Sequence, residues 1–356
     1  MSFVDVAATL RLPRAPDEED ARSLALAARA GGFGVVVCSP RGQEAVDVDR
    51  LASLARSLES AAVDGVTLVA ALSPLIGTDL ADVVSMVKSL PAAWPRVLRL
   101  RAAVDDALLF RRIGAVASAL GALVIVPSHD AALMKGAVAV EGAVATRLGL
   151  PSVPEASEHI AISRIIEVSK LTGARFHVAG VFSARGAALV DAAAGDGLVT
   201  GSVFPSHLLL DESALLACRY DTRLLTRPPL PTSSSRVALL DAVKRGALMV
   251  SSGHHAIPKR ERDLEMDRAT PGMTSLSSTA RLLSSVLSAA ELHRALSSGP
   301  AALLGIPAPS GAEIAIDVAL IASPSAAAPA PRGPPRAADG GDDLSRLVSL
   351  VSEVSV

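Results

Sequence analysis

The sequence predicts an α/β protein built as an eightfold (β/α)8 barrel. Eight short runs rich in Val, Ile and Leu recur between Ser2 and Ser252, and helix-like segments separate them. Strands that are buried on both faces read as continuous apolar runs, and strands that alternate with helices form parallel βαβ units. Closure of the eight units into one barrel is the simplest arrangement of this pattern.

The apolar runs are predicted to be the barrel strands in chain order. Their sequences are SFVDVAATL (2–10), GFGVVVCS (32–39), GVTLVAAL (65–72), RVLRLRA (96–102), GALVIVPS (121–128), GARFHVAGV (173–181), DGLVTGSVF (196–204) and GALMVSS (246–252). After the first run, a segment starts with acidic residues, which favour the positive end of a helix dipole, and closes on Gly31 and Gly32. The helix before the sixth run is likewise predicted to end at Gly173.

The composition excludes several classes of protein. A chain of 356 residues, 50% of them hydrophobic, can bury one large core, and a net charge of -2 shows no basic excess for a nucleic-acid partner. The N-terminus lacks the features of a signal peptide, and no apolar run is long enough to span a membrane. Cys38 lies in an apolar run and is predicted to be a buried free thiol. We expect a cytoplasmic protein.

The C-terminal part of the chain differs in character from the barrel. We assign residues 1–306 to the barrel, 307–322 to a remnant β segment and 323–343 to a disordered linker rich in Pro, Ala and Gly. Residues 344–356 carry apolar side chains on one helical face and are a candidate docking helix, with a frayed tail as the alternative.

Several strings of the sequence occur together in a recognisable order. They include FVDVAATLRLP near the start, FPSHLLLDE in the middle, and SSGHHAIPKRERDLEMDRATPGMTSLSSTARLL and LSSGPAALLGI near the end. From Val4 to Ile306 the chain resembles the dihydroorotase branch of the cyclic amidohydrolases. The resemblance implies a TIM-like barrel of the amidohydrolase superfamily, here with its small β-domain reduced or absent, unless the start lies further upstream.

The resemblance also implies a metal-dependent reaction that this chain does not match. Dihydroorotases reversibly close carbamoyl-aspartate to dihydroorotate, with a divalent metal, usually zinc, that polarises the amide carbonyl and supplies hydroxide. Such a site needs His and carboxylate ligands that converge from several strands. The positions of the family's ligands and final substrate-contacting histidine carry other residues here: Ala7, Thr9, Gly180, Ser206, His254 and Pro258. These positions are degenerate, so we expect no catalytic residue and no cofactor.

A few residues remain as candidates for a residual metal site. Asp130 matches a family ligand, and His254 with His255 forms an adjacent pair, with His207 one place away from another ligand position. Each has a structural alternative: a hydrogen-bonded or surface histidine pair, and a loop or helix cap for Asp130 beside His129.

Two further residues have structural explanations of their own. His177 is expected to be a satisfied core or helix-facing histidine. Lys135 is expected to be a solvated lysine rather than a carboxylated bridging ligand, because the histidines around such a ligand are missing.

Three arginines fall on substrate-contact positions of the family. Arg11 matches an arginine that pairs with the substrate carboxylate, and Arg41 and Arg227 stand where the family has asparagines. They form either a cationic pocket that holds an anion or a set of surface and ion-pair residues.

Three functions follow as hypotheses. The first is a catalytically inactive dihydroorotase homologue, because the resemblance implies that such chains in some bacteria associate with the aspartate transcarbamoylase catalytic chain and support its assembly. This reading expects an oligomer with no nucleic acid and no membrane as partner. The second is an active zinc-dependent cyclic amide hydrolase with a rearranged site, and the third is a small-anion binding module.

Overall fold

Eight parallel strands form the centre of the molecule. The computed structural model describes residues 3–11, 18–41, 48–61, 63, 65–76, 79–101, 104–218, 220–307 and 343–354. Within them, one sheet contains β1 (Phe3–Arg11), β2 (Phe33–Arg41) and β3 (Thr67–Ala70), and a second contains β6 (Val97–Arg99), β7 (Leu123–Pro127), β10 (Arg175–Ala179), β11 (Val199–Val203) and β12 (Met249–Val250). Each of these strands overlaps one of the eight predicted runs, and β1 and β2 extend past theirs by one and two residues.

Backbone hydrogen bonds join the two sheets at both edges. Between β3 and β6, the Arg99 amide donates to the Leu72 carbonyl at 2.7 Å. Between β12 and β1, the Thr9 amide donates to the His254 carbonyl, also at 2.7 Å. The strands therefore follow one another around a closed barrel in chain order, and the predicted fold class is confirmed.

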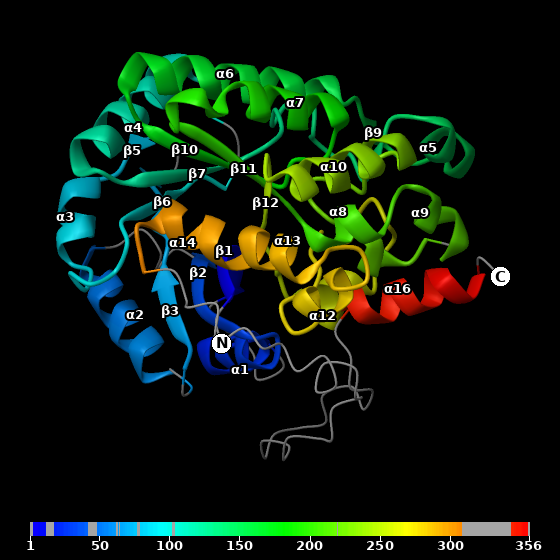
Figure 1. The fold of residues 1–356 in the computed structure, drawn as a ribbon, viewed down its shortest axis with the longest axis horizontal. Helices are drawn as coiled ribbons and strands as arrows, with labels where there is room; N and C mark the ends of the chain where they lie inside the picture. The colour runs from blue at the N-terminus through cyan, green and yellow to red at the C-terminus, as the bar shows by residue number, and fades with distance from the viewer. Residues whose placement is uncertain are drawn as a thin grey trace.

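Helices surround the barrel on its outside (Figure 1). They are α1 (Ala21–Ala30), α2 (Val48–Ser60), α3 (Val83–Lys88), α4 (Ala107–Leu120), α5 (Ala143–Leu148), α6 (Ala156–Thr172), α7 (Ala184–Ala192), α8 (Pro205–Leu209), α9 (Ser213–Ala217), α10 (Ser233–Arg245), α11 (Lys259–Arg262), α12 (Thr279–Leu283), α13 (Ala289–His293), α14 (Gly299–Leu304) and α16 (Asp343–Val354). Short 3-10 turns are η2 (Ala194–Asp196) and η3 (Thr222–Leu224), and η4 (Arg294–Ser298) is a π turn.

The predicted helix ends are confirmed at α1 and α6. Asp20 caps α1 by accepting a hydrogen bond from the Ser23 amide, and Gly31 follows its last residue. Gly173 closes α6 with a φ of 67°, a left-handed conformation that glycine adopts without steric cost. The capping residues that are visible in the sequence therefore set where both helices stop.

Apolar side chains fill the molecule in two layers. Alternate strand residues such as Cys38 and Val124 pack outward against helix residues such as Ile113. The residues between them face the barrel interior, where Val37 and Leu123 pack with Leu304 of α14. Burial raises the pKa of the Cys38 thiol to about 12, and this cysteine is free and buried, as predicted. The eight apolar runs are continuous because both of their faces are covered.

Two short pairings lie outside the barrel and were not predicted. The strands β4 (Leu75–Ile76) and β5 (Asp79–Leu80) pair antiparallel, and β8 (Ala139–Val140) pairs with β9 (Ser152–Val153) in parallel. Elements of two residues are shorter than the pattern by which a strand is recognised in a sequence. Among the described helices, none is both long and apolar enough to cross a membrane.

The C-terminal helix α16 packs beside α9 and η3 at one side of the barrel (Figure 1). Leu344 and Leu347 are fully buried in an apolar cluster with Leu215 and Leu224. The Leu344 amide also donates to the Thr274 carbonyl at 3.1 Å. The helix starts one residue before the predicted boundary, at Asp343, while the linker up to residue 342 and all of the remnant β segment except Pro307 lie outside the described residues.

Candidate functional site

A cavity of about 80 Å³ lies at the carboxyl end of the barrel. In this fold the carboxyl ends of the strands carry the functional groups. The cavity is lined by residues at the carboxyl ends of β1 and β6 and in the segments after β11 and β12, among them Thr9, Arg99, Thr226, Arg227, Ser252 and His255. None of the described lining residues is acidic. The candidate site is therefore small, polar and cationic.

The ring of Phe204 fills the space beside one of the predicted degenerate positions, Gly180, and beside Gly253. A Cβ atom placed on Gly180 would lie 2.8 Å from two atoms of this ring and 2.9 Å from Pro228 Cδ. A Cβ atom on Gly253 would also lie 2.8 Å from the ring, and both glycines have positive φ, 82° and 61°. The resemblance places the family's sixth-strand histidine at Gly180, and a side chain there would require Phe204 or Pro228 to move.

The other degenerate positions at strands one and seven are also occupied by structural groups. Ala7 is buried in the barrel-interior cluster, together with Phe204, and Thr9 lies at the cavity wall. Ser206 Oγ lies 3.2 Å from His207 Nδ1, and His207 Nε2 donates to the Pro229 carbonyl at 2.9 Å. Burial lowers the pKa of His207 to about 4, so this histidine is a neutral, fully bonded core residue.

His254 has hydrogen-bond partners at both ring nitrogens. Its Nε2 lies 2.9 Å from Glu19 Oε1, and its Nδ1 accepts from the backbone amides of Ser275 and Leu276 at 3.2 and 3.3 Å. The residue is 2% exposed. A neutral imidazole with a proton on Nε2 satisfies these contacts. Neither nitrogen has a lone pair left for a metal ion.

The remaining metal candidates do not converge. His255 lines the cavity, whereas Asp130 Oδ1 accepts hydrogen bonds from the amides of Ala132 and Leu133, both at 3.0 Å, and so caps a turn after β7. Pro258 precedes α11 and carries no donor for a substrate. In the described part of the chain, no three His, Cys, Asp or Glu residues gather where one metal ion could be held.

Two arginines of the predicted cationic pocket, Arg11 and Arg227, have described side chains, and only Arg227 lines the cavity. Arg11 forms a two-pronged salt bridge to Glu261, with distances of 2.8 and 2.9 Å, and it does not line the cavity. Arg227 does line the cavity, and burial lowers the pKa of its guanidinium. Arg41 ends β2, and its side chain lies outside the described part of the structure.

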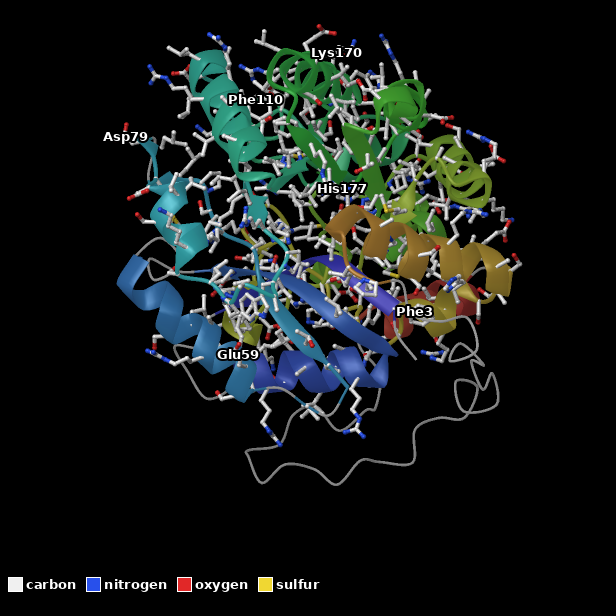
Figure 2. The ribbon with its side chains drawn as sticks, turned by 60° about the vertical axis from the view of Figure 1, so that its left-hand side comes forward. Phe3, Glu59, Asp79, Phe110, Lys170 and His177 are labelled. Carbon is white, nitrogen blue, oxygen red and sulfur yellow. The ribbon has the colours of Figure 1, made fainter. Side chains whose placement is uncertain are left out.

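His177 lies at the centre of the barrel (Figure 2). Its two ring nitrogens each lie 2.9 Å from a hydroxyl group, that of Thr200 and that of Ser202. Burial lowers its pKa to about 3, as the prediction of a satisfied core histidine implies. Lys135 is exposed, also in agreement with its expected solvated state.

His129 is buried at the exit of β7, and its Nδ1 has no hydrogen-bond partner in the described structure. Its pKa is lowered to about 4, first by burial and then by the positive charge of Arg227. This histidine is therefore neutral near pH 7.

Sequence reasoning missed three residues that shape the site. Phe204 ends an apolar run, so the sequence predicted only that it belongs to a strand. Glu19 lies in the acidic start of a predicted helix, where it was assigned no other role. Arg99 had a signal that was available, because a charged residue stood inside the fourth apolar run, RVLRLRA. Arg99 now lies at the cavity, and its Nη1 donates to the Ala8 carbonyl at 2.8 Å.

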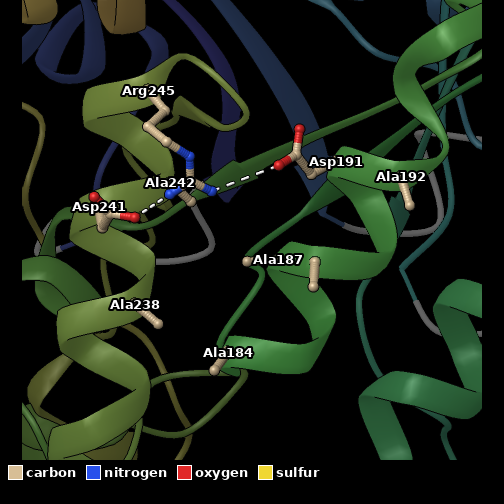
Figure 3. A pocket seen from close by; sticks show the side chains of 9 residues that line it. Ala184, Ala187, Asp191, Ala192, Ala238, Asp241, Ala242 and Arg245 are labelled. Atoms are coloured by element: carbon tan, nitrogen blue, oxygen red, sulfur yellow. Dashed lines mark hydrogen bonds and ion pairs between the residues drawn. The ribbon is translucent and has the colours of Figure 1, made fainter.

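A wider hollow of about 490 Å³ lies on the outside of the barrel, between α7 and α10 (Figure 3). Its wall is mostly alanine; Arg245 reaches across it to Asp191 of α7 and also pairs with Asp241 one turn earlier on α10. The Arg245–Asp191 distance is 3.5 Å, and all three side chains are about half exposed. Exposed ion pairs of this kind contribute little, and no convergent set of polar groups marks a binding site here.

Comparison with known proteins agrees with the fold. No family model matches the chain. A dihydroorotase-like protein of Pseudomonas putida is 32% identical over 315 residues, which cover 86% of this chain and 73% of the relative. A dihydroorotase of Anaeromyxobacter dehalogenans strain 2CP-C is 32% identical over 331 residues, which cover 90% of this chain and 75% of the relative.

Solved structures show the same fold at lower sequence identity. L-Hydantoinase from Arthrobacter aurescens has a TM-score of 0.73 at 16% identity, over 85% of this chain and 71% of that enzyme. Dihydropyrimidinase from Brevibacillus agri has a TM-score of 0.69 at 19% identity, over 86% of this chain and 71% of that enzyme. Taken with the sequence relatives, these matches show that the chain belongs to the dihydroorotase-like cyclic amidohydrolases.

Proposed function

We propose that this chain is a dihydroorotase-like protein without hydrolytic activity. The observation that carries the proposal is the position of the Phe204 ring, which leaves no space for a side chain at Gly180. If a metal-binding histidine had only been replaced by glycine, the space of its side chain would be empty, and the reverse substitution would fit. Here an aromatic ring occupies the space, so the interior packs as core where a hydrolase needs convergent ligands.

The described residues do not fit the zinc ion that the family uses. A catalytic zinc site needs about three protein ligands and an open position for water. His254 is committed to Glu19 and to two backbone amides, and Asp130 caps a turn. We therefore assign no reaction step to a metal ion in this chain.

An active enzyme with a rearranged site is the alternative. It would require His254 to leave its buried partners. Two backbone amides and the Glu19 carboxylate would then lose their hydrogen bonds to this histidine. Each buried polar group without a partner costs about 1–3 kcal/mol. This cost opposes the rearrangement. Similarity to relatives named dihydroorotases does not by itself imply the same activity, because a shared fold does not guarantee a shared reaction.

Metal content and turnover, measured on one sample, test the proposal. The purified full chain is analysed for zinc, and the same preparation is assayed with dihydroorotate and carbamoyl-aspartate. We expect far less than one zinc ion per chain, and a turnover rate no higher than that measured in buffer without protein. A dihydroorotase relative purified in the same way is the positive control. One or two tightly held zinc ions per chain together with turnover would refute the proposal.

We further propose that the chain acts as a structural partner of the aspartate transcarbamoylase catalytic chain. The support is a barrel kept in family order while its ligand positions have lost their donors, which is the pattern expected where selection acts on the surface of a scaffold. Co-expression with a tagged transcarbamoylase catalytic chain from the same organism tests it. We expect co-elution as a defined complex; separate elution with a fully assembled, active transcarbamoylase would exclude the partnership.

A further inference from the structure

Residues 270–276, the mouth segment, form one side of the cavity at the barrel mouth. Pro271, Gly272, Met273 and Ser275 line this cavity. We propose that α16 is a strap that holds the mouth segment against the barrel, so that release of α16 loosens this side of the mouth. The inference goes beyond the proposed function, because it concerns how the mouth is held closed and does not depend on whether the barrel hydrolyses a substrate.

The inner side of the mouth segment is hydrogen-bonded to the residues that follow β12. The His255 amide donates to the Met273 carbonyl at 3.0 Å, and the Ser275 hydroxyl donates to the Ser252 carbonyl at 2.8 Å. Among the described residues, the segment forms an isolated bridge between His254 and Met273 rather than a continuous strand pairing. Short irregular pairings open more easily than the ladders of the barrel strands, so further contacts are needed to hold this segment.

The first residues of α16 bind the mouth segment from its outer side. Asp343 and Thr274 are hydrogen-bonded in both directions: the Asp343 amide donates to the Thr274 hydroxyl at 2.9 Å, and the Thr274 amide donates to the Asp343 carboxylate at 3.1 Å. The Leu344 amide donates to the Thr274 carbonyl at 3.1 Å. The first amides of a helix have no partner within the helix, and here Thr274 supplies their acceptors. The start of α16 and the mouth segment therefore satisfy each other.

Arg262 joins the strap and the mouth segment through one side chain. Its Nη1 lies 3.0 Å from the Asp343 carboxylate, and the two side chains are 11% and 15% exposed. Its Nη2 donates to the Gly272 carbonyl at 3.1 Å. Ion pairs that are shielded from water are screened by salt less than exposed pairs, so this pair favours the docked helix. The same guanidinium thus holds α16 and the mouth segment together.

The apolar cluster that receives α16 is separate from the barrel core. It contains Leu344 and Leu347 of the helix and Met273 of the mouth segment, together with residues of α9 and η3. Among the described residues, no member of this cluster lies in the eight barrel strands. Undocking of α16 therefore leaves the barrel core closed, while Met273 loses apolar contacts. Local openings of this kind cost less free energy than unfolding of the whole molecule.

Hydrogen exchange of the full-length chain, resolved to single amides, tests the proposal. In the wild type we expect the amides of α16, His255 and Ser275 to share one degree of protection, lower than that of β10, because they open together before the barrel does. Asp343→Ala removes the ion pair and one hydrogen bond of the helix start, and Leu347→Ala removes a buried apolar side chain. Each should speed exchange in α16 and at His255 and Ser275 by about tenfold or more. The amides of His255 and Ser275 keep their own acceptors in both variants.

Asp191→Ala is the matched control. It also removes an aspartate that pairs with an arginine, Arg245, but between α7 and α10 on the outside of the barrel, and it should leave exchange at His255 and Ser275 unchanged. Exchange of these two amides at the wild-type rate in either strap variant would overturn the proposal. Protection of the two amides in the wild type as high as that of β10 would also overturn it, because the mouth segment would then open only when the whole barrel unfolds.

Discussion

At the scale of single residues, the lost ligand positions have been absorbed into the packing of the barrel. The ring of Phe204 lies against Gly180 and Gly253, and His254 is bonded to Glu19 and to two amides. In a close-packed interior, space that one side chain leaves is taken by another. The sequence shows which donors are missing, but not what fills their place.

The clash with Phe204 predicts the stability of substitutions at Gly180. Gly180→Ala should lower the free energy of unfolding by about 2–5 kcal/mol, because it combines left-handed strain with overpacking against the ring. Gly121→Ala is the control, since Gly121 also has positive φ, 62°, but open space around it, and it should cost only about 1–2 kcal/mol. Urea unfolding of both variants measures the difference. Equal losses would mean that the ring does not fill the site.

At the scale of elements, the ends of two helices could be predicted from the sequence, but the residues that each helix contacts could not. Asp20, Gly31 and Gly173 mark where α1 and α6 begin or end because capping is local. Glu158 of α6, by contrast, accepts hydrogen bonds from the amides of Phe182 and Ser183 at the start of α7, at 2.7 and 2.8 Å. That contact joins residues distant in sequence.

The docking of α16 predicts an effect of a single substitution. Leu347→Asp should lower the free energy of unfolding by about 3 kcal/mol or more, since it places a charge in the apolar cluster around Leu215 and Leu224. Leu171→Asp on α6 is the control, because Leu171 is 65% exposed and should tolerate the same change. Thermal unfolding of both variants checks this. A Leu347→Asp protein as stable as the control would show that α16 contributes nothing to the fold.

At the scale of the whole molecule, the closed barrel buries three histidines, His129, His177 and His207, as neutral side chains. Burial lowers the pKa of His177 to about 3 and those of His129 and His207 to about 4. Below the ordinary histidine pKa of about 6.5, these histidines therefore bind protons in the unfolded chain but not in the folded chain. Stability from these three histidines is lost as the pH falls from about 6.5 toward 4.

His177 allows this pH dependence to be isolated. Between about pH 6 and 4, wild-type stability should fall with pH more steeply than that of His177→Gln, by close to 1.4 kcal/mol per pH unit. Between about pH 7 and 8 the two curves should run parallel, because the imidazole is then neutral in both folded and unfolded chains. Urea titrations across this range measure both slopes. Identical acid slopes would mean that His177 is protonated in the folded protein.

The sequence by itself determined the fold class, the order of the eight barrel strands and the ends of two helices, and it predicts that the family's ligand positions fall on Ala7, Thr9, Gly180 and Ser206. These depend on apolar pattern, local capping and residue identity, all of which are written along the chain. Only the tertiary structure decided that the Phe204 ring packs against Gly180 and Gly253, that Arg11 pairs with Glu261 and that Arg99 and Arg227 line one cavity. Those contacts join strands far apart in sequence, and closure of the barrel alone brings them together.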